Sequence, residues 1–353
     1  MSFNYLDEFY EHPNKKMRDI FSNFLKKQGL EYEKNIELTL KVVDKSTGNM
    51  IGTGSIDGKI IKCLAIDEKR RGEGLSSHIL SILVKEQFKR GRNHIFIFTH
   101  PRNVVDISSK IFTGFNIIAK TDQIALLEMG SQSINEYINQ LTKKTIQIKK
   151  RYKGIIGSVV VNCNPFTLGH QYLIETAVKE CSFLYVFVVS EDQSVFPTNI
   201  RMKLIQAGTN HIKNVLVLEG GEYIISSATF PRYFIKNYND ISLEQARLDV
   251  TIFANYIAPA LGIQRRYVGE EPYSQVTKAY NQAMQEILIP KGIELKIIPR
   301  KEFNHEAISA SKVRVLIQEG KIQETINLIP KTTYDFLLSD EAKPIIKKLQ
   351  KSK

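Results

Sequence analysis

The most specific chemical signal lies in the second half of the chain, in the segment NCNPFTLGH that follows an apolar strand predicted at 157–161. Pro165 fixes a turn there, Gly169 permits close approach of another group, and Thr167 supplies a hydroxyl. His170 falls at the start of the next predicted helix, where unpaired amides and the helix dipole favour a phosphate. The segment therefore predicts a phosphate-binding site that includes a histidine.

A second phosphate motif, ISASKVR at 308–314, follows the last predicted strand. The first segment is similar to the (H/T)xGH signature of nucleotidyltransferases related to class I aminoacyl-tRNA synthetases, with Thr167 in place of the first histidine. The second resembles the ISSTxxR motif of that superfamily, although Ala310 removes one hydroxyl. Arg201 and the segment 269–272 also fall where family members contact nucleotide. The resemblance implies ATP contacts by Asn162, Asn164, Pro165, Phe166, Thr167, Gly169, His170, Arg201, Gly269, Glu270, Ser309, Ser311 and Arg314.

The chemistry that this resemblance implies is in-line attack on the α-phosphate of ATP, with pyrophosphate as the leaving group. Such chemistry depends on positioning and on neutralising charge, rather than on a covalent protein group. His170, with Lys312 or Arg314, would stabilise the transition state, and Mg²⁺ would be held through the phosphates rather than in a protein metal site. A lone histidine at a helix start is more often a cap, but two motifs in the right order favour a nucleotide site. Cys163 has no neighbouring His–acid pattern and is expected to be a packed thiol.

The first half contains another candidate site, the loop RRGEGLS between a predicted strand and a predicted helix. Its glycines let the backbone approach an anion, and its arginines add charge-assisted hydrogen bonds, which suits a pyrophosphate. Two weaker patterns are expected to be accidental: half of a dinucleotide fingerprint at 72–77, which lacks a βαβ unit, and an incomplete P-loop at 54–59.

About residues 30–130 resemble the GNAT acetyltransferases, in which a loop of this type holds the pyrophosphate of coenzyme A. The resemblance implies a pantetheine-bearing ligand, but it identifies no acid or base. Its implied contacts are Arg70, Arg71, Gly72, Glu73, Gly74, Leu75 and Ser76.

The elements that position these residues follow different patterns in the two halves. In the first, short strands in hairpin order precede a helix with Leu75, Ile79, Ile82 and Leu83 on one apolar stripe. In the second, buried strands alternate with helices, which predicts a parallel sheet with ligands at the carboxyl ends of its strands. We therefore expect an α/β protein: a GNAT-like mixed α+β domain at 1–135, a basic connector at 136–153, and a doubly wound, Rossmann-like nucleotidyltransferase domain at 154–353.

Composition narrows the class of protein. A length of 353 residues suits about two domains, and no apolar run reaches the roughly 20 residues that span a bilayer. Three cysteines without a CxxC pair argue against disulfides and zinc, and they favour the cytoplasm. The net charge of +12 would suit nucleic acid. However, no KH, RNA-recognition, zinc-finger or base-stacking pattern supports it, so a generally basic surface is the preferred interpretation.

The combination of the two halves closely resembles the citrate lyase ligase family. The resemblance rests on NCNPFTLGHQYLIE, SSATFPRYF at 226–234, VGEEPYSQVTKAYN and ISASKVR. It implies conversion of acetate and ATP to acetyl-AMP, followed by acetylation of a thiol. That thiol belongs to the CoA-like prosthetic group, a phosphoribosyl-dephospho-CoA, on the acyl carrier subunit of citrate lyase. The prosthetic group retains a pantetheine and a pyrophosphate, which gives the loop at 70–76 a ligand.

Three alternatives stay open at this point. The chain could use acetate to acetylate a tRNA cytidine, which the net charge allows but the CoA-type loop does not explain. It could join a cofactor-biosynthetic adenylyltransferase to an independent acetyltransferase, which would need no carboxylate. Finally, it could be a non-enzymatic sensor of CoA or nucleotide, although the intact His170 and loop glycines argue against degenerate sites.

Overall fold

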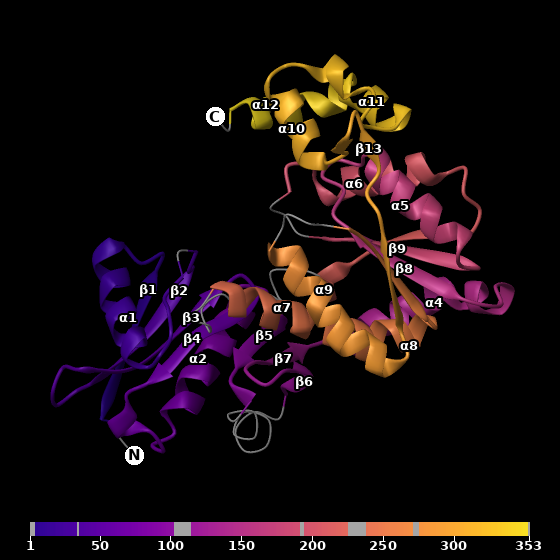
Figure 1. The fold of residues 1–353 in the computed structure, drawn as a ribbon. Coiled ribbons are helices and arrows are strands. Elements are labelled where there is room, and N and C mark those ends of the chain that lie inside the picture. Colours follow the sequence, from indigo (N-terminus) through magenta and orange to yellow (C-terminus); the bar gives the residue numbers. More distant parts are fainter. Residues whose placement is uncertain are drawn as a thin grey trace. The chain divides into compact units, whose positions relative to one another are not determined.

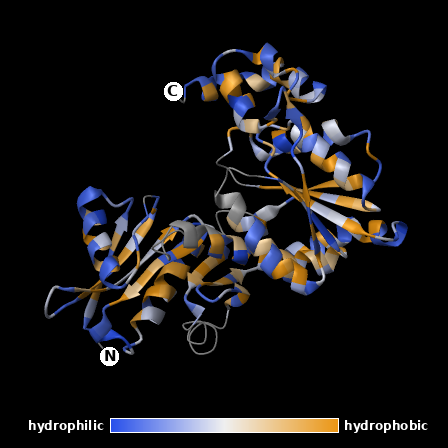
Figure 2. Cartoon of the chain, viewed as in Figure 1, coloured by the Kyte–Doolittle hydropathy of each residue, from blue (hydrophilic) through white to orange (hydrophobic). Residues whose placement is uncertain are grey.

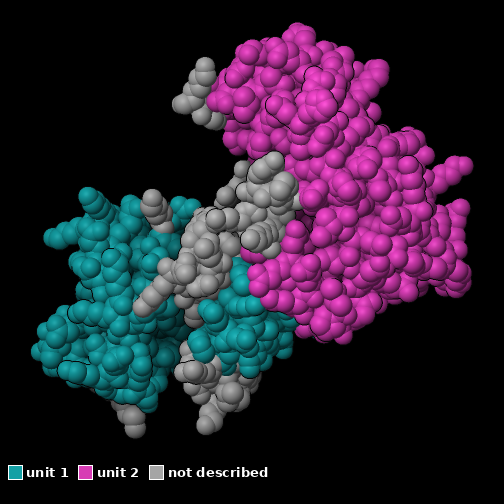
Figure 3. Space-filling model, viewed as in Figure 1, with its two compact units in different colours: residues 1–139, 228–251 teal, residues 140–227, 252–353 magenta. Residues whose placement is uncertain are grey.

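A computed structural model describes residues 4–33, 35–101, 114–190, 194–224, 238–270 and 275–351. The chain divides into two compact units, coloured separately in Figure 3: unit 1 comprises residues 1–139 and 228–251, and unit 2 comprises residues 140–227 and 252–353. The division falls within helix α4 (Ile134–Arg151), and helix α7 (Tyr238–Ile252) lies almost wholly in unit 1. There, Thr121 donates a hydrogen bond to the carboxylate of Glu244. The domain limits derived from the sequence stay a prediction.

The core of unit 1 is a seven-stranded sheet (Figure 1). In spatial order its strands are β1 (Tyr5–Glu11), β2 (Leu38–Asp44), β3 (Met50–Asp57), β4 (Ile60–Ile66), β5 (His94–Thr99), β7 (Ala125–Gly130) and β6 (Asn116–Lys120). All neighbours are antiparallel except β4 and β5, which run parallel. The hairpin order expected from the sequence is therefore confirmed, and the sheet contains one parallel pair.

That parallel pair separates along its length. Strands β4 and β5 pair only at Ile60↔Phe96 and Ile61↔Ile97, although β4 continues to Ile66 and β5 to Thr99. The pairing of β3 with β4 also shifts register, and Cys63 within the shift has a φ of 55°. An extra residue of this kind bends a strand away from its neighbour. The carboxyl ends of β4 and β5 consequently leave a gap in the sheet.

Helix α2 (Leu75–Lys89) packs on the sheet of unit 1, and helix α1 (Lys15–Lys27) lies between β1 and β2 in the chain. Three residues of the predicted stripe, Leu75, Ile79 and Leu83, are buried, while Ile82 is partly buried. Gly54 permits this approach, because a Cβ there would lie 2.7 Å from Leu83 Cδ1. The amphipathic helix predicted from the sequence is confirmed.

Unit 2 is built on a five-stranded sheet in which every pair is parallel. Its spatial order is β10 (Val215–Glu219), β9 (Phe183–Val188), β8 (Ile156–Val161), β11 (Arg265–Gly269) and β12 (Glu294–Ile298). The chain moves outward from β8 to β10 and then returns to the other side of β8 as β11. Ligands of such sheets bind where the order reverses, outside the carboxyl ends of the strands. In this sheet that point lies between β8 and β11.

Helices cover both faces of this sheet, with α5 and α6 on one side and α8 and α9 on the other (Figure 1). These four helices are α5 (Leu168–Lys179), α6 (Thr198–Thr209), α8 (Ala258–Leu261) and α9 (Gln275–Leu288). Three further helices follow in the chain: α10 (Ala310–Gln318), α11 (Lys331–Leu337) and α12 (Lys343–Gln350). Burial on both faces explains why a strand such as FLYVFV consists of aliphatic and aromatic residues, and Figure 2 colours much of this sheet as hydrophobic. The predicted fold class is confirmed. In the described part of the chain, no helix is both long and apolar enough to cross a membrane.

Candidate functional site

The two phosphate motifs of unit 2 meet in one cavity at the point where the strand order reverses. The cavity has a volume of about 600 Å³ and lies at the ends of β8, β11 and β12. The first turns of α5 and α10 also line it, so two helix N-termini contribute to a site that suits an anion. Of the residues predicted to contact ATP, it is lined by Asn162, Thr167, Gly169, His170, Gly269, Glu270, Ser309 and Ser311.

Direct contacts hold the two motifs together, although about 140 residues separate them in the sequence. A Cβ placed on Gly169 would lie 3.0 Å from the backbone oxygen of Ile308, which shows how closely α5 approaches the second motif. Arg314 Nη1 donates a hydrogen bond to the Asn164 carbonyl oxygen at 2.6 Å, and its Nη2 donates to Ser311 Oγ at 3.0 Å. Gly169 and Arg314 therefore hold the two phosphate motifs next to each other.

Replacement of Gly169 by alanine is expected to lower the free energy of unfolding by about 1–3 kcal/mol, the usual effect of overpacking. Alanine favours a helix over glycine by about 1 kcal/mol, so helix propensity alone would predict the opposite sign. The Ile308 oxygen belongs to the backbone and cannot rotate away from the new methyl group. Urea unfolding measures the change, with Gly269→Ala as a control for stability, because a Cβ at Gly269 meets nothing within 4 Å. An unchanged midpoint in Gly169→Ala would contradict the close contact.

His170 is held in one orientation by a reciprocal cap at the start of α5. Thr167 Oγ1 accepts a hydrogen bond from the His170 amide at 3.3 Å, and His170 Nδ1 accepts one from the Thr167 amide at 3.1 Å. Because Nδ1 accepts, the proton of the neutral ring is assigned to Nε2. Burial, together with the nearby charge of Arg300, lowers the pKa of His170 to about 4. At neutral pH His170 is therefore an uncharged donor through Nε2–H, rather than a cation.

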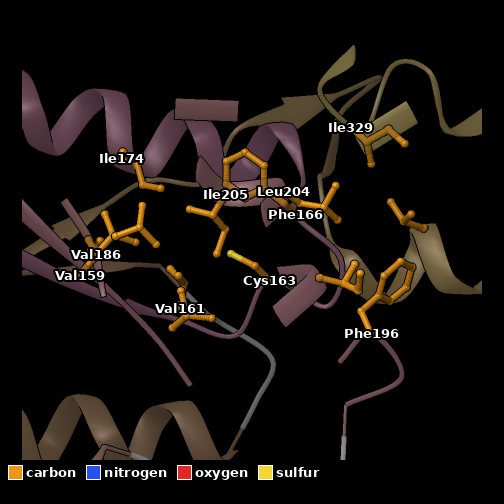
Figure 4. Close-up of a cluster of buried hydrophobic side chains, with 14 of the residues drawn as sticks. Val159, Val161, Cys163, Phe166, Ile174, Val186, Phe196, Leu204, Ile205 and Ile329 are labelled. Carbon is orange, nitrogen blue, oxygen red and sulfur yellow. The ribbon is translucent and has the colours of Figure 1, made fainter. Parts of the chain in front are cut away.

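Several residues predicted to contact ATP lie outside this cavity. Phe166 is fully buried in the core, where Gly208 makes room for its ring: a Cβ on Gly208 would lie 2.4 Å from that ring. Pro165 is also buried, and Asn164 Oδ1 accepts a hydrogen bond from the Phe196 amide at 3.0 Å. These three side chains shape the loop. Figure 4 shows Phe166 and Cys163 among the buried side chains. Burial raises the pKa of the Cys163 thiol well above its usual range, as expected for a packed thiol.

The expectation that Arg201 contacts the nucleotide is not supported, because its side chain is fully buried. Its guanidinium donates hydrogen bonds to the carbonyl oxygens of Asn162 at 2.9 Å, Val189 at 2.6 Å and Phe196 at 2.9 Å. A further bond joins it to Thr198 Oγ1 at 2.8 Å. Arg201 instead fixes the ends of β8 and β9 relative to α6.

The two cations expected to stabilise the transition state also lie beside the cavity rather than in its lining. Lys312 forms an ion pair with Glu306, which lies in the short hairpin of β13 (Glu302–Phe303) and β14 (Glu306–Ala307). The guanidinium of Arg314 is half-buried and bonded to Asn164, and burial lowers its pKa. Their roles in catalysis stay predictions.

Sequence reasoning missed two cations that do line the cavity, Arg300 and Lys301. Both directly follow β12 and Pro299, so the rule that ligands bind at the carboxyl ends of parallel strands could have identified them. Tyr172 and Leu173 on α5 were also missed.

Glu270 is the acidic residue among the described residues of the lining. One carboxylate suits Mg²⁺, which keeps several waters and binds mainly through phosphates. In the part of the chain that the structure describes, no group of three or more His, Cys, Asp or Glu residues could hold a metal ion.

Unit 1 has its own cavity, of about 590 Å³, in the gap between the ends of β4 and β5. The predicted loop residues that line it are Arg70, Arg71, Gly72, Gly74, Leu75 and Ser76. Gly72 and Gly74 have φ values of 85° and 79°, which favour glycine, and Gly74 is the N-cap of α2 without a capping side chain. The amides of the first turn of α2 are therefore left for an anion.

The two arginines of this loop differ in their partners. Arg70 Nη1 pairs with Asp44 at 2.5 Å and its Nε with Glu73 at 2.7 Å, so the Arg70 guanidinium braces the loop. Glu73 does not line the cavity. Arg71 has a side chain that is 58% exposed, and its Nη2 donates to Gln28 Oε1 at 2.8 Å, a neutral partner that a phosphate could replace. A pyrophosphate in this cavity would meet Arg71 and the α2 amides.

Together these features define a protein of two units, one built on a mixed seven-stranded sheet with an anion-binding type of loop and one built on a doubly wound parallel sheet in which two phosphate motifs line one cavity. A family model, "Citrate lyase ligase C-terminal domain", matches residues 156–337. The citrate (pro-3S)-lyase ligase of Klebsiella pneumoniae is 36% identical over 330 residues, which cover 92% of this chain and 94% of that protein. The ligase of the same name from Escherichia coli K12 is 37% identical over 92% of this chain and 91% of its own. The chain belongs to the citrate lyase ligase family, and it is an enzyme of the ligase class.

Solved structures show weaker similarity. Thermotoga maritima TmcAL bound with alpha-thio ATP is 14% identical, with a TM-score of 0.38 over 54% of this chain and 57% of that one. Pantoate-beta-alanine ligase from Francisella tularensis is 16% identical, with a TM-score of 0.36 over 60% of this chain and 83% of that one. The segments 226–234 and 271–274, which contributed to the family resemblance, lie outside the described residues.

Proposed function

We propose that this enzyme uses ATP to convert acetate to acetyl-AMP. It then acetylates the thiol of the CoA-like prosthetic group on the acyl carrier subunit of citrate lyase. The observation that supports the first step most directly is the meeting of both phosphate motifs in one cavity, where the strand order of a parallel sheet reverses. Membership of the citrate lyase ligase family supports the choice of carrier.

In the first step, an oxygen of acetate forms a bond to the α-phosphorus of ATP, and the bond from that phosphorus to the bridging oxygen breaks. Acetate attacks as its anion, so the step needs no general base; the main difficulty is to bring two anions together. The N-termini of α5 and α10 and the Nε2–H of His170 supply fixed positive dipoles for this purpose. Mg²⁺, when bound through the phosphates beside Glu270, would neutralise further charge on the leaving pyrophosphate.

In the second step, the thiol loses its proton, its sulfur bonds to the acetyl carbonyl carbon, and AMP leaves. The loop cavity of unit 1 supports a role in holding the acceptor. It combines the pyrophosphate-type loop with a gap between β4 and β5 that is lined by apolar residues such as Leu64 and Phe98. A slender pantetheine arm fits such a lining, while Arg71 would hold the pyrophosphate.

Exchange of labelled pyrophosphate into ATP tests the first step with the protein alone. Exchange is expected to require acetate and Mg²⁺, because only adenylation of the acid makes pyrophosphate release reversible. Exchange without any acid, or no exchange with acetate and other short acids, would contradict the proposal. If acetate-dependent exchange occurs but the acetyl group reaches a tRNA cytidine instead of the acyl carrier subunit, the assignment of the acceptor would be wrong.

A further inference from the structure

The cationic residues that line the nucleotide cavity are not the ones that the sequence motifs predicted. Of the three cations taken from the motifs, Arg201 is buried on carbonyl oxygens, and neither Lys312 nor Arg314 lines the cavity. Among the described residues that line the cavity, the cations are Arg300 and Lys301. A reaction between a carboxylate and a triphosphate needs positive charge at the place where they meet. These two residues are therefore the candidates to supply it.

Arg300 is fixed at the edge of the sheet by the strands on which the cavity is built. The Glu270 amide donates to the Ile298 carbonyl oxygen at 2.9 Å, which continues the β11–β12 ladder past the ends of the strands. Arg300 Nε donates to the Glu270 carbonyl oxygen at 2.7 Å. The stem and one donor of the guanidinium are thus anchored to β11. Its charge acts on the His170 ring, whose pKa it helps to lower, so Arg300 and His170 share one electrostatic environment.

Arg300 suits a carboxylate better than Lys301 does. A guanidinium presents donors in a planar fork that matches the two oxygens of a carboxylate, whereas an ammonium is a strongly hydrated point charge. Arg300 is partly buried, while Lys301 is exposed, so the Arg300 charge is screened less by water. Leu173 and Ile298 line the same cavity and offer apolar surface for a short alkyl group.

We propose that Arg300 is the catalytic residue that binds the carboxylate of the short acid substrate and directs one of its oxygens at the α-phosphorus. This inference rests on the proposed acetate adenylation and names the subsite for the acid. The oxygen–phosphorus bond forms while the bond to the pyrophosphate oxygen breaks, and no proton moves. Arg300 screens the repulsion between the two anions and does not exchange a proton with either.

Arg300→Gln tests the proposal, because glutamine keeps an amide donor for the Glu270 carbonyl but removes the charge and the fork. The KM for acetate in pyrophosphate exchange is expected to rise by about 30-fold, within the range for charge-assisted hydrogen bonds. The affinity for α,β-methylene-ATP, measured by calorimetry without acetate, is expected to stay within about threefold. Arg300→Lys, which restores the charge without the fork, is expected to recover part of the acetate affinity.

Lys296→Gln is the matched control, since it removes one positive charge from β12 at a residue paired with Glu294 and outside the cavity lining. Its acetate KM is expected to equal that of the wild type. An acetate KM in Arg300→Gln that matches wild type would overturn the proposal. An equal loss of affinity for acetate and for α,β-methylene-ATP would also overturn it, because Arg300 would then bind the triphosphate. A lack of acetate-dependent exchange in the wild-type protein would instead overturn the proposed function, and this inference with it.

Discussion

Replacement of His170 by alanine is expected to reduce acetate-dependent ATP–pyrophosphate exchange by about 100- to 1,000-fold, the usual cost of removing one preorganised donor from a transition state. Burial and the nearby Arg300 lower the pKa of His170 to about 4, which favours the neutral ring near pH 7, and its Nδ1 accepts a hydrogen bond from the Thr167 amide. Its contribution is therefore the Nε2–H, held in the cavity that both phosphate motifs line. The effect should fall mainly on kcat, because the charge on the phosphates increases as pyrophosphate leaves.

Two comparisons separate this chemical role from a structural one. His211→Ala removes an exposed histidine of the same unit, paired with Glu175 at 3.0 Å, and should leave exchange unchanged. His170→Asn retains a neutral donor and should recover part of the rate. Thr167 still caps α5 in both His170 variants, so the free energy of unfolding should fall by only about 1 kcal/mol. Exchange by His170→Ala within a few-fold of wild type would show that His170 is only a cap.

Much of the fold could be predicted because its strands are apolar for a simple physical reason. Strand β9 is buried along its whole length, which requires helices on both faces and hence a parallel, doubly wound sheet. In unit 1, the turn at Gly58 and the stripe of Leu75, Ile79 and Leu83 likewise indicated a hairpin and a packed helix. The placement of α7 in unit 1 could not be predicted, since it depends on contacts such as Thr121–Glu244 between segments far apart in the chain.

The site was predicted less completely, because a motif gives the type of a residue but not the direction of its side chain. Arg201 has the expected type at the expected place, yet it points into the protein and binds carbonyl oxygens from separate segments. Phe166 points into the core in the same way. Arg300 belongs to no motif and reaches the cavity only because β12 ends beside β11. Side-chain direction and strand adjacency are properties of the folded chain, and they decide which charges the nucleotide meets.

The direction of the side chain also separates two adjacent arginines in the loop of unit 1, both of which were predicted to contact the CoA-like prosthetic group. Glu73 and Asp44 both bind the Arg70 guanidinium and favour its charged form, which raises its pKa further. The pKa of the Asp44 carboxyl is lowered, because it accepts hydrogen bonds from Ser46 and from Arg70. An anion that displaced Glu73 and Asp44 would leave two carboxylates without their partner, so Arg70 is expected to stay in place. Among the described residues, Arg71 would have to leave Gln28 and the more distant Glu68 carboxylate, at 3.6 Å.

Arg71→Glu is therefore expected to lower kcat/KM for acetylation of the acyl carrier subunit by about 100-fold, while acetate-dependent pyrophosphate exchange stays unchanged. The loss corresponds to about 3 kcal/mol, from a charge-assisted hydrogen bond to phosphate that is replaced by repulsion. Transfer of labelled acetate to the carrier measures the effect. Lys85→Glu is the control, because it makes the same charge change at an exposed residue of α2 outside the loop cavity. Unchanged carrier acetylation in Arg71→Glu, or an equal loss in Lys85→Glu, would contradict the assignment of this loop to the prosthetic group.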